Sequence, residues 1–238
     1  MNSFTLNSAI QQSAQANGYW LIQFSLKEPL PFAQSLGQGF FLSSASQTEL
    51  YLFQHAEHNP SQHYQFLSNQ PLPEEILTRP GELISTNLTS ITLADENQAL
   101  LILGEDLAMA NVFALAKQRT LVRTQAPTIA MLASQTSYPF ILKPARYLMP
   151  EMPPEAMGAC TLLEDWQVQN RLASQLGLPG CFEGDISDLF LYWVEAMQQD
   201  VADGEATNWQ VMLFTDKAMQ KKCLQIGHNQ NWLTMLAF

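Results

Sequence analysis

Two expected strand-to-helix junctions in the second half of the chain place acidic residues where nucleotide chemistry would occur. The first is Leu103-Gly104-Glu105-Asp106-Leu107, and the second is Phe214-Thr215-Asp216-Lys217. A helix that follows a buried strand binds phosphate at its N-terminus when glycines leave its backbone N–H groups bare. Here Gly104 is the only glycine, and Glu105 and Asp106 add negative charge. Two unit charges about 4 Å apart repel by roughly 1–4 kcal/mol, so we expect impaired diphosphate binding.

The acidic residues at these junctions also have a structural interpretation. An aspartate that precedes a helix caps free backbone N–H groups and interacts favourably with the helix dipole. We therefore interpret Asp106 and Asp216 first as N-caps. The alternative for Asp106 is a hydrogen bond to a ribose hydroxyl.

Three histidines, His55, His58 and His63, lie close together in the sequence with Glu57. Zinc sites need three or four ligands in fixed geometry, usually at short and regular spacing. The spacing His-x2-His-x4-His in a polar segment favours a solvated loop instead. We expect no metal site here, and none at the isolated His228.

The sequence contains no complete motif for nucleophilic or acid–base catalysis. Cys181 has no basic neighbour to lower the pKa of its thiol, so we do not expect it to be a nucleophile. Glu164 and Asp165 are adjacent, point in different directions on a helix, and therefore do not form an acid–base pair. The sequence contains no nucleophile elbow, P-loop or His-Glu-x-x-His motif. The catalytic residues, if the chain has any, are unknown.

The composition limits the classes of partner. The 238 residues include 11 Lys and Arg against 22 Asp and Glu, which gives a formal net charge of −11. Nucleic acids and anionic membranes both attract basic surfaces, so this charge argues against either partner. The acidity serves solubility, or it indicates a basic protein partner. Hydrophobic residues make up 47% of the chain, which is typical of a globular protein.

The sequence also gives an expectation for the compartment. No apolar run reaches the roughly 18 residues of a membrane helix, and the N-terminus does not resemble a secretory signal. Three widely separated cysteines, Cys160, Cys181 and Cys223, do not make a disulfide framework. We expect a cytoplasmic protein.

The elements that position these residues change in type after Asp95. Before it, the sequence predicts short strands at roughly ten-residue spacing, separated by Gly and Pro turns, which favours a small barrel or sandwich. The expected strands cover 19–26, 40–43, 49–53 and 62–67. We therefore place a first domain at 1–95.

From 96 to 238 the sequence predicts alternating strands and helices, and hence a parallel sheet with helices on its faces. Apolar runs at 99–103 and 128–132 are typical of strands buried on both faces. A capping-box pattern, Thr161 with Glu164, predicts a helix at 161–176. The remaining expected elements are strands at 209–214 and 232–236 and helices at 107–117, 185–197 and 217–225. Asp185 is expected to cap the second of these helices.

Five segments are similar to motifs of one known family. They are Leu36-Gly37-Gln38 with Phe40, Arg79-Pro80-Gly81-Glu82-Leu83, Ala99 to Gly104, Gly184-Asp185-Ile186-Ser187-Asp188-Leu189, and Phe214 to Met219. With the order of the two domains, they resemble the ferredoxin reductase superfamily and, within it, the dihydroorotate dehydrogenase electron transfer subunits. The resemblance implies a β + α/β fold: an N-terminal small antiparallel β-barrel that is flavin-binding-like, followed by a parallel doubly wound α/β domain that is nucleotide-binding-like.

The resemblance also implies cofactors and the residues that would bind them. The cofactors are FAD and NAD(P)H. Tyr51 and Phe53 would stack on the flavin ring, and Gly104 and Asp106 would approach the nucleotide. Met219 occupies the last position of the family's Cys-Gly-Pro-x-Pro-Met motif.

Four family motifs are altered, which implies weak or absent cofactor binding. The flavin-binding arginine is missing from 49–55, and Thr86 to Thr89 replaces a Gly-Pro-Leu-Gly loop. The nucleotide turn is Gly104-Glu105-Asp106 in place of three glycines, and Thr215-Asp216-Lys217 replaces Cys-Gly-Pro. Three scattered cysteines do not supply the four thiolates of an iron–sulfur cluster, so we expect none.

These observations leave different functions open. The first is a divergent FAD/NAD(P)H-dependent oxidoreductase that transfers electrons, which the fold analogy favours. The second is a non-enzymatic scaffold or regulatory subunit that binds a protein partner, which the loss of four motifs favours. A third is small-molecule binding in a cleft between the domains. Fold alone does not decide among them.

Overall fold

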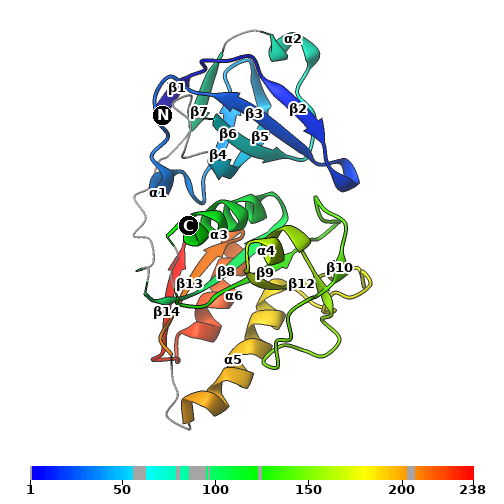
Figure 1. Ribbon diagram of the computed structural model, residues 1–238, viewed down its shortest axis with the longest axis vertical. Helices are drawn as coiled ribbons and strands as arrows, with labels where there is room; N and C mark the ends of the chain where they lie inside the picture. The colour runs from blue at the N-terminus through cyan, green and yellow to red at the C-terminus, as the bar shows by residue number, and fades with distance from the viewer. Residues whose placement is uncertain are drawn as a thin grey trace. The chain divides into compact units, whose positions relative to one another are not determined.

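The computed structural model describes residues 2–55, 63–78, 81–85, 95, 97–122, 125–202 and 207–238. The chain folds into two compact units, Met1–Leu93 and Ala94–Phe238 (Figure 1). In the described part of the chain, no helix combines the length and the apolar character needed to cross a membrane.

The first unit is an antiparallel barrel. Its strands are β1 (Asn2–Thr5), β2 (Gln11–Ala14), β3 (Trp20–Ser25), β4 (Gly39–Leu42), β5 (Ala45–His55), β6 (His63–Ser68) and β7 (Glu82–Ser85). They pair in the order β1-β7-β4-β5-β6-β3-β2. Backbone bonds from Lys27 N to Thr5 O (2.9 Å) and from Asn7 N to Ser25 O (2.7 Å) join the end of β1 to the end of β3 and close the sheet.

Three aromatic rings fill the barrel core. Phe24 stacks on Phe66 with 5.1 Å between the ring centroids, and Phe40 meets Phe66 edge-on at 5.6 Å. The four strands expected from the sequence are confirmed as β3 to β6. Strands β1 and β2 were missed because they are short and mostly exposed, so their sequences carry no apolar alternation. The described part of this unit also contains three short helices: η1 (Ala16–Gly18), α1 (Phe32–Ser35) and α2 (Glu74–Leu77).

The second unit is built on a five-stranded parallel sheet. Its strands are β8 (Ala99–Glu105), β9 (Thr128–Ala133), β12 (Gln169–Ala173), β13 (Trp209–Phe214) and β14 (Leu233–Ala237). They lie in the order β12-β9-β8-β13-β14. The chain first builds outward from β8 through β9 to β12, and then returns to add β13 and β14 on the other side of β8. The strand order therefore reverses between β8 and β13.

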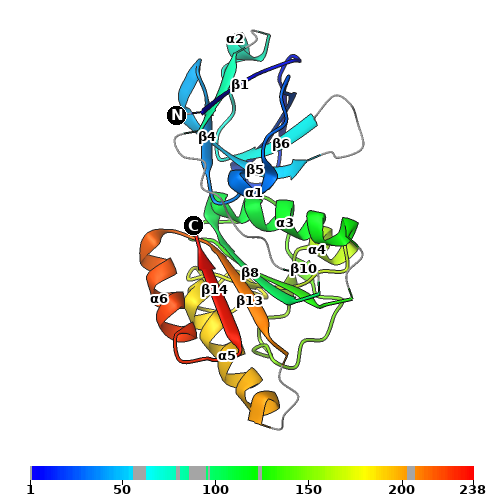
Figure 2. The same ribbon diagram turned by 90° about the vertical axis from the view of Figure 1, so that its left-hand side faces the viewer.

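Helices cover both faces of this sheet, so the expected doubly wound architecture is confirmed (Figure 2). On one face lie α5 (Ile186–Ala202) and α6 (Lys217–Gly227), and on the other lies α3 (Ala110–Leu121), which follows the 3-10 turn η2 (Asp106–Met109). A tryptophan cluster fills the space under α5: Trp193 meets Trp209 edge-on at 5.2 Å and lies 5.6 Å from Trp232.

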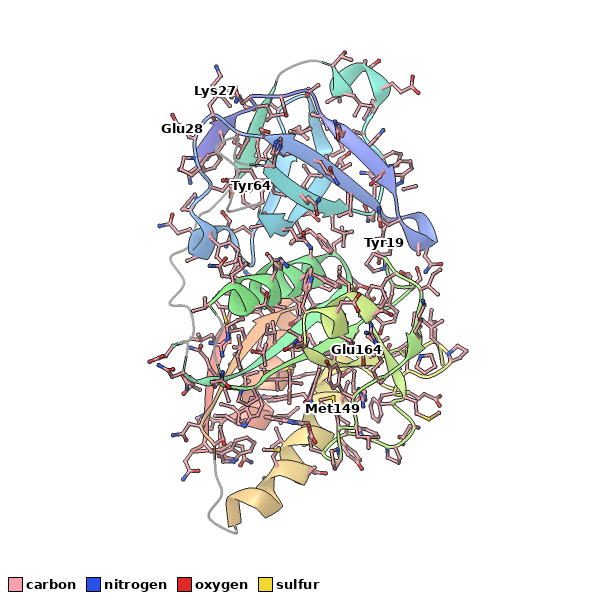
Figure 3. The ribbon with its side chains drawn as sticks, in the orientation of Figure 1. Tyr19, Lys27, Glu28, Tyr64, Met149 and Glu164 are labelled. Carbon is pink, nitrogen blue, oxygen red and sulfur yellow. The ribbon has the colours of Figure 1, made fainter. Side chains whose placement is uncertain are left out.

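The helix expected at 161–176 is wrong. Only α4 (Thr161–Asp165) forms, and Gln167 then adopts a φ of 62° before strand β12 begins. The Thr161–Glu164 capping box does not exist: the N-cap is Cys160, with no side-chain bond. Glu164, labelled in Figure 3, instead accepts bonds from Arg146, through Oε1 from the backbone N at 2.7 Å and through Oε2 from Nε at 3.1 Å. A partner 18 residues away in the sequence thus replaces the local cap.

The segment between β9 and α4 was not predicted in any form. It contains a small hairpin, β10 (Lys143–Pro144) with β11 (Gly158–Ala159). Two arginines fasten the segment: Arg146 contacts both Glu164 and Asp165, and Arg171 of β12 donates to the Tyr147 carbonyl at 2.7 Å. Glu164 and Asp165 therefore reach the same guanidinium group, contrary to the expectation that adjacent residues point apart.

Candidate functional site

The candidate site lies where β8 and β13 end, at the point where the strand order reverses. In open α/β sheets, ligands bind outside the carboxyl ends of the strands at such a point. Here β8 ends at Glu105 and leads into η2, and β13 ends at Phe214 and leads into α6. Both junctions singled out in the sequence therefore meet at one edge of the sheet. Figure 1 shows β8 and β13 side by side.

Gly104 is a glycine because a helix crosses it closely. A Cβ atom at this position would come within 2.3 Å of Val112 Cγ2 and within 2.8 Å of Met109 Cα. The space above Gly104 is thus filled by the start of α3. Close helix–strand packing is one role of glycine in dinucleotide-binding turns. This packing is sufficient to explain the glycine without a phosphate above it.

Asp106 is not an N-cap, which corrects the sequence interpretation. Glu105 precedes η2, and neither residue caps it with a side-chain bond. Asp106 has a φ of +48°, in the left-handed region that Asp and Asn tolerate better than other non-glycine residues. Its Oδ1 accepts hydrogen bonds from Ser134 Oγ and from Gln135 N, both at 3.0 Å. Asp106 therefore ties the end of β8 to the loop that follows β9.

Asp216 is the N-cap of α6, as expected. Its Oδ1 accepts a bond from Met219 N at 2.8 Å, which occupies one of the free N–H groups that would receive an anion. The side chain of Met219 is 9% exposed and belongs to the buried core between the sheet and α5 and α6. The structure thus gives Met219 a packing role.

Asp185 adds a third carboxylate near this edge and caps α5, as the sequence predicted. Its Oδ1 accepts bonds from Ser187 N (2.8 Å) and Asp188 N (3.1 Å), while Asp188 Oδ2 accepts from Asp185 N (3.0 Å). This reciprocal pair is a true capping box. Lys222 of α6 forms an ion pair with Asp185 Oδ2 at 2.8 Å. These hydrogen bonds and Lys222 lower the pKa of Asp185, against the opposing effect of burial.

Glu105 is the residue at this edge that sequence reasoning undervalued. It is 6% exposed, and burial together with the charges of Asp106, Asp216 and Asp185 raises its pKa to about 7. A hydrogen bond from the Gln135 side chain opposes this shift. A carboxyl group that is about half protonated near neutral pH marks the centre of a crowded acidic site. Its burial by β8 and η2 could not be seen in the sequence.

The candidate flavin residues lie on β5 of the barrel. Tyr51 is half-buried, and its hydroxyl lies 3.5 Å from the position that a Cβ on Gly39 would take. Burial and the neighbouring Glu49 raise the pKa of Tyr51. Phe53 is 7% exposed, because the pairing of β5 with β6 shifts between Leu52 and Gln54 and turns Phe53 inward at a bulge. Only Tyr51 of the pair thus presents part of its ring outside the core.

The diphosphate group of FAD would need basic side chains to balance its charge, and the described part of the barrel supplies few. Strand β5 contains no Lys or Arg, and Lys27 is the one basic residue among the described positions of this unit. Arg79 and the Thr86–Thr89 segment lie outside the described residues. The same is true of His58 and Glu57, whereas the Nδ1 atom of His63 lies 2.7 Å from Ser25 Oγ.

The described residues contain no group of three His, Cys, Asp or Glu side chains placed to hold a metal ion. All three cysteines are buried and free, and burial raises the pKa of Cys160 and Cys181 to about 11 and of Cys223 to about 12. Thiols with such pKa values are poor nucleophiles.

A cavity of about 600 Å³ lies away from this site, at the amino ends of β9 and β12. Its two cationic residues are already engaged. Lys117 lies 4.9 Å from the centre of the Trp166 ring, and Arg119 donates to the carbonyls of Asp95 (2.9 Å) and Gln98 (2.7 Å). Both cationic side chains among the described lining residues are therefore already held by contacts within the chain.

No protein-family model matches the sequence, and no curated protein matches it. Solved structures match its fold over nearly the whole chain. The cytochrome P450 reductase GcoB of Amycolatopsis is 13% identical, with 100% of this chain and 70% of that chain covered and a TM-score of 0.60. The ferredoxin reductase of carbazole 1,9a-dioxygenase is 11% identical, with 100% and 70% covered and a TM-score of 0.61.

Phthalate dioxygenase reductase, described as a modular structure for electron transfer from pyridine nucleotides to [2Fe–2S], is 9% identical, with 99% and 67% covered and a TM-score of 0.51. At these identities the likeness is one of fold. It confirms the expected ferredoxin-reductase-like class: an antiparallel barrel followed by a parallel α/β unit.

Proposed function

We propose that this chain is a divergent relative of FAD- and NAD(P)H-dependent electron transfer reductases that has lost dinucleotide binding at its α/β unit and acts as a non-enzymatic, partner-binding subunit. Its altered motifs resemble those of dihydroorotate dehydrogenase electron transfer subunits. The observation behind the proposal is the convergence of Glu105, Asp106, Asp185 and Asp216 at the carboxyl edge of the sheet.

Charge is the first reason that a diphosphate does not fit this edge. Each carboxylate about 4 Å from a phosphate oxygen would oppose binding by roughly 1–4 kcal/mol. Lys222, which lies near this edge, is already paired with Asp185. Phthalate dioxygenase reductase, whose fold this chain shares, transfers electrons from pyridine nucleotides to [2Fe–2S].

Geometry is the second reason. The backbone N–H of Met219 is bonded to Asp216, and the space above Gly104 is filled by Val112 and Met109. The Oδ1 atom of Asp106 is bonded to the neighbouring loop, which fixes the orientation of this side chain. Each feature that would hold a dinucleotide thus serves the protein's own packing.

An oxidoreductase that keeps a flavin in the barrel is the second candidate. The half-buried ring of Tyr51 next to Gly39 favours it, because an aromatic ring beside a glycine leaves room for a planar ligand to stack. Its weakness is the absence of a cation on β5.

A binding experiment separates the two candidates. We expect the purified protein to be colourless, to retain no added FAD on gel filtration, and to show no calorimetric heat with NADH or NADPH. A yellow protein that NADH reduces would overturn the proposal. A yellow protein that does not bind NADH would support the barrel candidate.

The electrostatic cause has its own test. The double variant Glu105→Gln, Asp106→Asn removes two acidic groups from the edge where β8 and β13 end. It keeps the Oδ1 acceptor of residue 106. We expect only weak NADH binding to appear in it, because the variant removes the charges and leaves the geometry unchanged. The matched control, Glu28→Gln with Glu155→Gln, removes two charges from exposed positions and should leave binding unchanged.

A further inference from the structure

The outer surfaces of α5 and α6 differ in charge and share exposed apolar side chains. On α5 the exposed stripe is Asp188, Leu191, Tyr192 and Glu195, at steps of three, one and three residues. On α6 it is Lys217, Lys221 and Leu224, at steps of four and three, and His228 follows directly after the helix. Residues three or four apart share one face of a helix. Each helix therefore presents one continuous stripe, acidic on α5 and basic on α6.

Both stripes carry partly exposed apolar side chains. Leu191 is 41% exposed, Tyr192 is 39% and Leu224 is 38%. A shallow groove of about 420 Å³ runs along α6 and is lined by Lys217, Lys221 and Leu224 among others. A ring with a polar tip, such as that of tyrosine, suits a groove with an apolar floor and charged walls.

Two of the six lysines in the chain, Lys217 and Lys221, stand on this stripe. Among the described residues neither forms an ion pair within the chain, in contrast to the neighbouring Lys222, which faces Asp185. In a chain with twice as many acidic as basic residues, a helix face that is only basic is a local exception. Its complement, the acidic stripe of α5, lies on the adjacent helix of the same layer (Figure 2).

We infer that this face binds a second copy of the chain in a two-fold symmetric dimer. Symmetry places α5 of each copy against α6 of the other, so every contact occurs twice. Tyr192 enters the groove of the other copy beside Leu224, and the acidic stripe of α5 faces the basic stripe of α6. The occupant is a second copy because one surface contains both halves of the complementary pair. This inference does not depend on the proposed function.

The size of the surface predicts a weak dimer. Helix α5 has 17 residues and is roughly 25 Å long, and two helices side by side are roughly 20 Å wide, which gives an area of about 500 Å² per copy. That is below the roughly 800 Å² per partner of a standard interface. The dimer should therefore form in the micromolar range and weaken with salt, because part of its attraction is between exposed charges.

Sedimentation velocity of the whole chain tests this inference. From about 1 to 200 µM protein, the wild type should shift from monomer to dimer, and less so at about 500 mM salt than at about 50 mM. Tyr192→Glu should raise the dissociation constant at least about tenfold. Leu148→Glu, at a position that is 91% exposed elsewhere in the same unit, is the matched control and should change nothing. A wild type that stays monomeric at every concentration, or a control that weakens the dimer as much as Tyr192→Glu, would overturn the inference.

Exchanging acidic and basic residues between α5 and α6 provides a second test, because a misfolded variant would not regain the dimer. Glu195→Lys alone and the pair Lys217→Glu, Lys221→Glu should each weaken the dimer. The triple variant should bind itself more tightly than either parent variant, since the inverted charges at 195, 217 and 221 are again opposite in sign. Failure of the triple variant to recover would show that the two stripes do not face each other. An acidic partner of another kind would respond to the lysine changes and not to Glu195→Lys, and that outcome would also refute the dimer.

Discussion

The Oδ1 atom of Asp106 accepts a hydrogen bond from Ser134 Oγ at 3.0 Å, and this bond joins the carboxyl ends of neighbouring strands β8 and β9. The same oxygen accepts the N–H of Gln135. The residue achieves this in a left-handed backbone conformation, with a φ of +48°. Position 106 therefore combines two stabilising bonds with one unfavourable torsion.

Substitutions at Asp106 should separate these two contributions. Asp106→Ala loses both bonds and puts an alanine at positive φ, so we expect a loss of about 2–4 kcal/mol in the free energy of unfolding. Asp106→Gly loses the bonds but relaxes the backbone, with an expected loss of about 1–2 kcal/mol. Urea denaturation measures both. Equal losses in the two variants would show that the torsion costs nothing.

Glu105 should make stability depend on pH near neutrality. Its pKa is about 7 in the folded protein against an ordinary value of 4.5. Between these values the folded state binds more protons than the unfolded state, so stability decreases as pH rises. Below pH 4.5 the contribution is fully present, and above pH 7 it is lost.

The Glu105→Gln variant isolates this effect because glutamine stays neutral. We expect the variant to gain about 1–3 kcal/mol relative to the wild type between pH 5.5 and pH 8, measured from urea midpoints. For the control Glu28→Gln, at an exposed position, the free energy of unfolding should change with pH as it does in the wild type over the same range. A difference between Glu105→Gln and wild type that is the same at both pH values would contradict the raised pKa.

Gly104→Ala should be strongly destabilising for a steric reason. The added methyl group would meet Val112 Cγ2 and Met109 Cα, and the second atom belongs to the backbone and has little freedom to move. Overpacking of this kind costs about 3 kcal/mol. Adding Val112→Ala should restore only part of the loss. Gly81→Ala is the control, since its Cβ would meet nothing closer than 3.6 Å.

The acidic side chains whose roles were misread share one physical cause. Asp216 and Asp185 were predicted as caps because a cap acts on residues two or three positions away, within reach of local sequence. Asp106 and Glu164 were misread because their partners, Ser134 and Arg146, are 28 and 18 residues away. The fold class was accessible since apolar runs and their alternation determine it.

Strand β12 illustrates the same limit. Its sequence, Gln169-Asn-Arg-Leu-Ala, looks like a polar helix segment, yet Asn170 is fully buried. Its side chain accepts from Cys160 N at 2.7 Å and donates to Cys160 O at 3.2 Å, which holds the start of α4 against the strand. The buried side-chain amide of Asn170 is tolerated because the backbone of Cys160 satisfies its hydrogen bonds, and this partner is known only from the fold.

Asn170→Ala should therefore destabilise the protein more than a surface change does. It leaves the buried N–H and carbonyl of Cys160 without these partners, and we expect a loss of about 2–4 kcal/mol. Gln169→Ala, one residue earlier and half-buried, should cost less than about 1 kcal/mol. Hydrogen exchange adds a local readout: the amide of Cys160 should exchange faster in Asn170→Ala. Unchanged protection of that amide would show that the bond contributes nothing.

The three cysteines should be chemically silent in the folded protein. Cys181 is 8% exposed and the other two are 1% and 0%, and burial raises the pKa of each thiol well above 9. At pH 8 a thiol of pKa about 11 is ionised to roughly one part in a thousand, and access is blocked as well. A disulfide reagent that reports free thiols by colour should thus detect none within minutes in buffer and all three in urea.

Rapid modification of one thiol in the native protein, mapped to Cys181 by peptide mass, would reveal a reactive site that neither the sequence nor its burial indicates. If that modification were abolished by Tyr138→Phe, the neighbouring phenol, which hydrogen-bonds the thiol, would be the activating group.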